Sequence, residues 1–173
     1  MTIQTERLTL RPLALRDLKT TFAYASDPEH TQYMLHLPVH KKRQTKLWLK
    51  YVQKQWKVKP PERYEFAVLL DGRHIGAVGL GIKDEARQSG EMGWIIDQAY
   101  QGRGYVTEAA RAVLGFARDE LGLKHVYARC DYRNVASTRI MEKLGMALED
   151  DTRTRRYNDS DEEIRELRYS ITF

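Results

Sequence analysis

Residues 94–109 read WIIDQAYQGRGYVTEA, an apolar strand that runs through a glycine turn directly into a helix. Gly102 and Gly104 let the chain turn tightly, and they let an anion approach the main chain without meeting a Cβ atom. Such a turn aims several free backbone N–H groups and the N-terminus of a helix at one small volume. The segment therefore predicts a phosphate-binding turn between a strand and a helix.

The composition favours one water-soluble domain spanning residues 1–173, because the chain is long enough for a proper core and shows neither repeat nor linker. Apolar residues make up 42%, and no run approaches the ~18 residues of a membrane span. The first residues lack the basic and apolar regions of a secretory signal. Cys130, the only cysteine, cannot form an intramolecular disulfide. We therefore expect a cytoplasmic protein with no membrane partner.

The net charge of +5 is unevenly distributed, since residues 41–59 contain eight basic and no acidic residues, whereas residues 149–151 and 159–166 are mostly acidic. Within the basic run, Trp48, Val52 and Trp56 recur every four residues beside Leu49, so a helix is predicted with its aromatic residues facing the core. A solvated face is the favoured interpretation of the charges. Contact with RNA or the ribosome and attraction of an anionic ligand are the alternatives.

The remaining periodicities predict a mixed α/β (α+β) fold with a central sheet of about six to seven strands and helices on both faces. Asp71-Gly72 is a hairpin signal, and Asn134 is a good N-cap for a helix that ends at Gly145. Strands are expected at 8–13, 64–70, 74–82, 89–97, 126–130, 149–157 and 164–172, helices at 17–25, 41–59, 107–121 and 134–144, and a loop or short helix at 31–38.

Three motifs in this order resemble the GCN5-related N-acetyltransferase (GNAT) family, and within it the RimJ/RimL group of ribosomal-protein-alanine N-acetyltransferases. They are TERLTLRP at 5–12, QGRGYVTEA at 101–109, and NVAS through KLG at 134–145, and the resemblance covers nearly the whole chain. It implies a GNAT fold, in which the sheet is split between two parallel strands. It also implies an enzyme that transfers acetyl directly from acetyl-CoA to a primary amine.

The resemblance also implies how acetyl-CoA binds. The family motif Gln/Arg-x-x-Gly-x-Gly/Ala matches residues 101–106 except at Val106, whose side chain must point away from the pyrophosphate. The pyrophosphate is expected on the N–H groups of this loop, and the pantetheine arm beside residues 94–96, next to a splayed strand at 126–130. The implied cofactor-binding residues are Trp94, Ile95, Ile96, Gln101, Gly102, Arg103, Gly104, Tyr105, Val106, Thr107, Asn134 and Ser137.

Acetyl transfer requires a neutral amine and a departing thiolate. An α-amine of pKa ~7.7 to 8.0 loses its proton far more readily than a lysine-like amine near ~10.4, so a base matters most for the latter. Glu91, on the strand before the loop, and Glu149, which matches a functional carboxylate of RimL-like proteins, are the candidate bases. Glu149 is equally well interpreted as one acid in an exposed acidic run.

The leaving sulfur also needs a hydrogen-bond donor. Many family members place a tyrosine eight positions into the helix that Asn134 begins, where this chain has Met141. Ser137, one turn earlier on the same face, is the predicted donor, since a thiolate of pKa ~8.5 leaves readily. The alternative is that Ser137 only bonds the backbone. Cys130 is interpreted as a small buried hydrophobic residue rather than a nucleophile.

The acceptor pocket is expected from residues 31–38, the ends of the split strands and the turn at 158–159. Its candidate substrate-binding residues are Tyr33, His36, Glu91 and Asp159. The RimJ/RimL resemblance favours the N-terminal amine of a protein, including a ribosomal one. The acids at 159–163 favour the alternative, a small amine such as a polyamine, an aminoglycoside or an amino acid.

Two further alternatives stay open. Val106 and Met141 are compatible with a non-catalytic CoA-binding protein, and residues 41–59 with direct binding of nucleic acid, although beyond proximity to the ribosome that is disfavoured. The histidines show no metal-ligand spacing, so no metal is predicted. The resemblance leaves a homodimer open.

Overall fold

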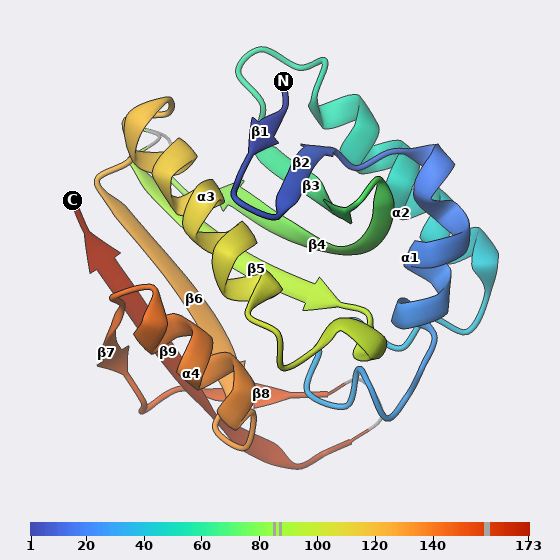
Figure 1. Cartoon of the computed structure of the whole chain (residues 1–173). Coiled ribbons are helices and arrows are strands. Elements are labelled where there is room, and N and C mark those ends of the chain that lie inside the picture. The colour runs from blue at the N-terminus through green and yellow to red at the C-terminus, as the bar shows by residue number, and fades with distance from the viewer. Residues whose placement is uncertain (85, 87, 158–159) are drawn as a thin grey trace.

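The computed structural model describes residues 1–173 apart from 85, 87, 158 and 159 (Figure 1). Two short 3-10 helices, η1 (Leu15–Asp17) and η2 (Gln98–Tyr100), accompany the longer elements. The helices are α1 (Leu18–Ala25), α2 (Lys42–Gln55), α3 (Tyr105–Asp119) and α4 (Val135–Lys143). The strands are β1 (Ile3–Gln4), β2 (Leu8–Pro12), β3 (Arg63–Leu70), β4 (Arg73–Ile82), β5 (Ser89–Ile96), β6 (His125–Asp131), β7 (Ala147–Asp150), β8 (Thr154–Arg156) and β9 (Glu163–Thr172).

The described strands form one mixed sheet in the order β1-β2-β3-β4-β5-β6-β9-β7, with β8 paired to β9. This confirms the predicted fold class, although nine strands are present rather than six to seven. The strand expected over residues 149–157 is broken in two. The Asp150 carboxylate accepts hydrogen bonds from the Thr152 N–H and from Arg153, which turns the chain between β7 and β8.

The sheet is split between β5 and β6, its parallel pair. The two strands are paired from Ser89 and His125 to Met92 and Ala128, where their ladder ends. Beyond that point β6 stays paired with β9 as far as Asp131, while the last four residues of β5 stay on β4. Figure 1 shows the two strands diverging toward their C-terminal ends. The predicted splaying of β6 is therefore confirmed.

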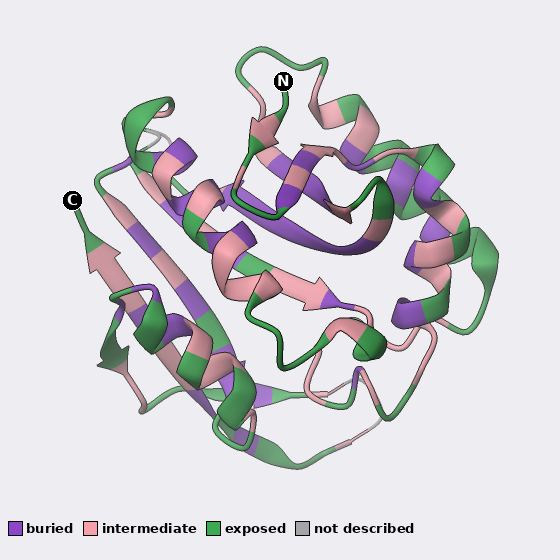
Figure 2. Cartoon of the chain, viewed as in Figure 1, coloured by how far each residue is buried: buried purple, intermediate pink, exposed green. Residues whose placement is uncertain are grey.

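Helices α3 and α4 cover one face of the sheet, and α1 and α2 cover part of the other (Figures 1 and 2). The larger core cluster joins α3 to the strands through Val113, Phe66 and Met92. The smaller cluster places Leu49 and Val52 of α2 against the opposite face. Because side chains alternate between the faces of a strand, Met92 faces α3 and its neighbour Glu91 faces the side of α1 and α2.

The basic helix is confirmed as α2, but the prediction that Trp48 faces the core is wrong. Trp48 is 38% exposed, whereas Leu49 and Val52 are fully buried. The buried stripe also contains Thr45, so its centre is rotated around the helix axis by about one residue from Trp48. Trp56 is half-buried, and its indole N–H donates to the Glu65 carbonyl at 3.2 Å. Within the described residues, no helix combines the length and apolar character needed to cross a membrane.

Candidate active site

The tight turn predicted between a strand and a helix is present, and both of its glycines have positive φ angles. Gly102 has φ +74°, and Gly104, the N-cap of α3, has φ +80°. L-residues rarely adopt this left-handed conformation, and no atom lies within 4 Å of a Cβ built at Gly102. Helix α3 begins at Tyr105, two residues earlier than predicted, because Gly104 itself forms the cap. The free N–H groups of the first turn of α3 therefore point out of the exposed loop at 101–104.

A cavity of about 400 Å³ opens beside this turn, between the N-terminal segment, α3 and α4. Arg111 donates from Nη2 to the Lys143 carbonyl at 2.8 Å, which joins α3 to α4 at the cavity. Three cationic side chains and a helix N-terminus suit the phosphate groups of CoA. The lining residues are Glu6, Arg7, Gly104, Thr107, Glu108, Arg111 and Lys143.

The N-terminal segment holds the turn in place through Glu108, in the first turn of α3. The Glu108 carboxylate accepts from the Thr5 hydroxyl at 2.6 Å, from the Arg7 N–H at 2.8 Å and from the Arg7 Nε at 2.7 Å. Arg7 also donates from Nη1 to the Arg103 carbonyl at 3.1 Å and lies 4.6 Å above the Tyr105 ring. These three residues, called the Thr5–Arg7–Glu108 clamp below, fix the loop to a part of the chain about a hundred residues away.

Val106 is accommodated without obstructing the loop. Its half-buried side chain packs against the larger core cluster, as does that of Tyr105. The bulkier residue at this motif position therefore points into the protein, as the sequence required.

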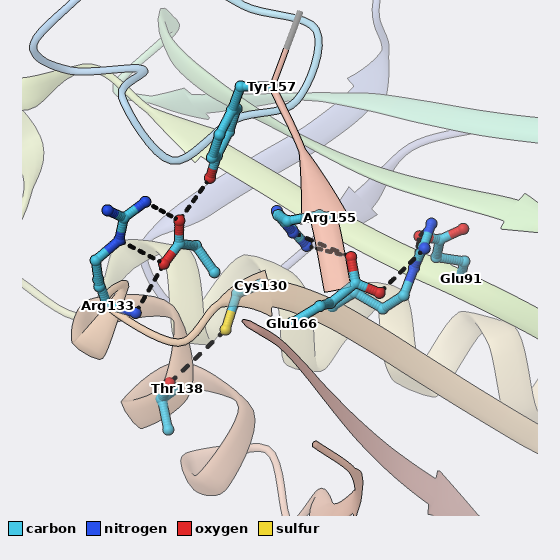
Figure 3. Close-up of polar contacts among 9 residues, drawn as sticks. Glu91, Cys130, Arg133, Thr138, Arg155, Tyr157 and Glu166 are labelled. Carbon is cyan, nitrogen blue, oxygen red and sulfur yellow. Dashed lines mark hydrogen bonds and ion pairs between the residues drawn. The ribbon is translucent and has the colours of Figure 1, made fainter. Parts of the chain in front are cut away.

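Glu91 lies on the face of α1 and α2, one residue before the pairing of β5 with β6 ends. It belongs to a chain of ion pairs (Figure 3). Its carboxylate contacts the Lys83 Nζ at 2.8 Å and the Arg129 Nη2 at 2.7 Å. Arg129 also contacts Glu166, which is held in turn by Arg155 at 2.9 Å. Burial raises the pKa of the Glu91 carboxyl, but the hydrogen bonds from Lys83 and Arg129 outweigh it and hold that pKa below its ordinary value.

A second polar cluster lies at the end of β6, beyond the last residue that pairs with β5 (Figure 3). The buried Asp131 carboxylate accepts from the Arg133 Nη2 at 2.7 Å and from the Tyr157 hydroxyl at 2.8 Å. Burial and the bond to Asp131 raise the pKa of Tyr157 to about 12, so it stays protonated at neutral pH. Arg133 lies 5.7 Å from the Tyr33 ring. Tyr33, predicted to bind substrate, is thereby brought to the split from the loop before α2.

The loop before α2 also reaches the glycine turn, since the His30 Nδ1 and Gln101 Nε2 atoms are 3.3 Å apart. No helix forms at 31–38, so the loop interpretation of this segment is confirmed. His36 is exposed in this loop, and no partner is found for it among the described residues. Asp159 and the centre of the turn at 158–159 lie outside the described residues.

Helix α4 begins as predicted, with the Asn134 Oδ1 accepting the Ser137 N–H at 3.1 Å. The Ser137 side chain is half-buried in this first turn, and its hydroxyl has no partner among the described residues. Met141 is fully buried in the core, one turn further along. Cys130 is buried beside Thr138, and burial raises the pKa of its thiol, which agrees with a packing role.

Glu149 is not brought to the split. It lies on β7 at the far edge of the sheet, where its carboxylate contacts the Arg168 Nε at 2.6 Å and the His125 Nε2 at 3.5 Å. His125 begins β6, three residues and roughly 10 Å before the split opens after Ala128. A bulge in the pairing of β7 with β9 falls at this position. The structure thus separates the two predicted bases, and only Glu91 borders the split.

The sequence interpretation gave no individual role to Arg7, Glu108, Arg129, Asp131 or Tyr157. Arg7 and Glu108 stood inside quoted motifs, and their contact across 101 positions is not readable from either motif alone. The role of Arg129 could have been predicted, because it is an arginine on the strand expected to lie beside that of Glu91 and to splay from it. Among the described residues, no group of three or more His, Cys, Asp or Glu side chains is arranged to hold a metal.

The Asn134 cap yields a stability prediction. Replacing Asn134 with Ala should lower the free energy of unfolding by about 1 kcal/mol, because the Ser137 N–H loses its acceptor at the helix start. Asn134→Ser should retain most of the stability. Urea denaturation of the three proteins measures the difference, and an unchanged free energy of unfolding in Asn134→Ala would show that the cap contributes nothing.

Asp131 should make stability depend on pH. Burial raises the pKa of its carboxyl, but bonds from Arg133 and Tyr157 outweigh it and keep the pKa below its ordinary value. A lowered pKa means that the stabilisation is complete above the unfolded pKa of ~3.9 and is lost as the pH falls through the folded value. Urea unfolding between pH 5 and 3 should therefore show a shallower pH dependence for Asp131→Asn than for the parent protein. An unchanged slope would contradict this.

The family model described as "Acetyltransferase (GNAT) domain" matches residues 7–147. The N-acetyltransferase YnaD of Bacillus subtilis (strain 168), described as uncharacterized, is 30% identical over 153 residues, covering 86% of this chain and 84% of the relative. Spermidine N(1)-acetyltransferase of Escherichia coli (strain K12) is 28% identical over 141 residues, covering 81% and 73%.

Solved structures show the same fold. A GNAT-family acetyltransferase from Bacillus anthracis matches with a TM-score of 0.84 and 28% identity, over 99% of this chain and 98% of that one. The ribosomal-protein-S5-alanine acetyltransferase of Vibrio fischeri matches with a TM-score of 0.83 and 19% identity, over 99% and 96%. Together with the glycine turn, the split sheet and the family match, these similarities show that the chain belongs to the GNAT family of acetyl-CoA-dependent N-acetyltransferases.

Proposed function

We propose that this N-acetyltransferase acts on the N-terminal α-amine of a polypeptide, as the RimJ/RimL resemblance suggested. The observation that carries the proposal is the position of Glu91 between Lys83 and Arg129. A carboxylate with a lowered pKa is a weak base, so it suits an acceptor that already loses its proton near neutral pH. An α-amine meets this condition, and an alkyl amine of a polyamine or lysine does not.

Acetyl-CoA supplies the acetyl thioester, and its pyrophosphate fits the cavity beside the glycine turn. The N–H groups at the start of α3 and the side chains of Arg7, Arg111 and Lys143 would hold the phosphates. The free edge of β5 from Gly93 to Ile96 would hold the pantetheine arm, because no described residue pairs with its N–H and C=O groups on the side of β6 beyond Met92. Trp94, Ile95 and Ile96 lie in this segment.

In the proposed reaction, residues act from the two faces of the split sheet. On the face of α1 and α2, Glu91 orients the amine and accepts its proton through a water molecule as nitrogen bonds to the acetyl carbon. On the face of α4, Ser137 hydrogen-bonds the sulfur that leaves with the electron pair of the broken C–S bond. A first-turn hydroxyl can help there, because the helix N-terminus itself favours a thiolate.

The second candidate acceptor is a small polyamine. The relative from Escherichia coli that is named for spermidine favours it, as does the acidic run from Asp161 to Glu163. Against it, the acids described at the split, namely Glu91, Asp131 and Glu166, are each paired with arginine. A carboxylate already bonded to guanidinium groups offers little further attraction to a polycation.

The acceptor class is tested by thiol release from acetyl-CoA with a panel of peptides, polyamines and aminoglycosides. A peptide with a free N-terminus should be acetylated, and the same peptide blocked at its N-terminus but carrying a lysine should not. Preferential turnover of spermidine would replace the first candidate with the second. Binding of acetyl-CoA with no turnover on any acceptor would favour the non-catalytic alternative.

A further inference from the structure

Helix α2 exposes a charged surface that acetyl transfer does not use. It packs on β3, whereas the split lies between β5 and β6. Within the described residues, none of the eight basic side chains of residues 41–59 forms an ion pair or a hydrogen bond. By contrast, most of the acids described at the split and at the clamp are bonded to basic side chains. The unpaired residues are Lys41, Lys42, Arg43, Lys46, Lys50, Lys54, Lys57 and Lys59.

The placement of these charges destabilises the helix that carries them. Lys41 is the N-cap and Lys42 and Arg43 follow, and the first turn contains no acid, so cations lie at the positive end of the helix dipole. Lys46, Lys50 and Lys54 are spaced by four residues, which places like charges next to one another on the surface. A bound polyanion would remove both unfavourable terms.

Part of this surface is hollowed. A depression of about 210 Å³ lies between α2 and η1, and three of its five lining residues are the lysines at 50, 54 and 57. Leu15 and Gln53 complete it, so no acid borders it. Three ammonium groups around one depression can contact phosphates of a polyanion from several sides.

Tyr51 lies next to the lysines, and Trp48, whose ring is 5.0 Å from the Arg63 guanidinium, lies beside Tyr51. Tyr51 is 45% exposed and Trp48 38% exposed, with ring centroids 5.6 Å apart and an angle of 34° between the rings. Tyr51 is one turn from Lys54 on the same side of the helix, so ring and cation are neighbours. Exposed rings beside cations are the combination by which proteins hold unstacked bases and their phosphates.

We propose that the surface of α2 formed by Trp48, Tyr51, Lys50, Lys54 and Lys57 binds single-stranded RNA. Stacked bases of a duplex do not offer their faces to Tyr51, so a single strand fits better than a double strand. An acidic protein would satisfy the lysines without using the rings. The proposed RNA site does not depend on which amine is acetylated at the split.

The test is fluorescence anisotropy with a labelled 12-nucleotide oligo(U) RNA, from 50 to 300 mM salt. Binding should weaken with salt with a logarithmic slope of about −2 to −3, as three to four phosphate contacts predict. The triple variant Lys50→Gln, Lys54→Gln, Lys57→Gln should bind at least tenfold more weakly, and Tyr51→Ala about tenfold. An oligo(U) strand annealed to oligo(A) and a poly-glutamate peptide complete the panel, and oligo(dT) reports whether the sugar matters.

A control variant with Lys19→Gln, Arg118→Gln and Lys124→Gln removes the same charge from other exposed positions. It should bind RNA like the parent protein, and both triple variants should still bind acetyl-CoA. The proposal is overturned by an absence of RNA binding at 50 mM salt, or by equal losses in both triple variants, which would mean net charge alone. It is also overturned if poly-glutamate or duplex RNA binds as tightly as oligo(U), or if Tyr51→Ala has no effect.

Discussion

Replacing Glu91 with Gln should lower kcat for a peptide acceptor by about a hundredfold, the lower end of the range for loss of a proton acceptor. Glutamine keeps the shape of the side chain and can still contact Arg129, but it accepts no proton and carries no charge. The KM for acetyl-CoA should change little, because Glu91 lies on the sheet face away from α3 and the glycine turn. Steady-state kinetics by thiol release gives both constants.

Glu149→Gln is the matched control for Glu91→Gln, since both remove one carboxylate from a partner arginine. The position of Glu149 on β7 predicts a kcat within about twofold of the parent value. Melting temperatures of both variants separate a catalytic loss from unfolding. If Glu149→Gln lost as much activity as Glu91→Gln, the assignment of the base to the split would be wrong.

Glu108→Ala should raise the KM for acetyl-CoA by about tenfold while kcat at saturation stays within threefold. The Thr5–Arg7–Glu108 clamp then loses its shared acceptor, and the loop at 101–104 keeps only the contacts of Arg7 with the Arg103 carbonyl and the Tyr105 ring. Charge-assisted hydrogen bonds of this kind are each worth about one factor of ten when they are not screened by solvent. Glu108 is half-buried, and Arg7 is more exposed. Because solvent weakens their ion pair, we expect one factor of ten in KM rather than one for each hydrogen bond.

The clamp acts through the loop, so it can be distinguished from a general contribution to stability. The dissociation constant of CoA, measured by calorimetry, should weaken in parallel with KM in Glu108→Ala. Glu108→Gln should recover part of the affinity, because an amide oxygen still accepts from the Thr5 hydroxyl and the Arg7 N–H. A drop in kcat with unchanged KM and CoA affinity would mean that the clamp does not position the cofactor loop.

Local patterns predicted those parts of the site that depend on neighbouring residues. The tight turn at Gly102 and Gly104 and the cap from Asn134 are properties of short segments, and the structure has both as expected. The split was implied by family resemblance and is confirmed by the end of pairing at Met92. The core-facing side of α2 was predicted to include Trp48, but the buried side is centred on the next residue and Trp48 is exposed.

Contacts between distant segments were not predictable in the same way. Glu149 was linked to the site by its distance along the chain from α4, but a bulge and the strand order put it at the sheet edge. The bond between Arg7 and Glu108 and the pairing of Arg129 with Glu91 and Glu166 depend on which strands are adjacent. No periodicity within a single segment contains that information.

The most direct test of the account is a crystal structure of the protein with CoA. The account predicts pyrophosphate oxygens within hydrogen-bonding distance of the N–H groups at 102–106 and of Arg111 or Lys143. It also predicts the sulfur in the split, between residues 93–96 of β5 and 129–131 of β6, within reach of the Ser137 hydroxyl. A pyrophosphate bound away from the glycine turn, or a sulfur outside the split, would contradict it.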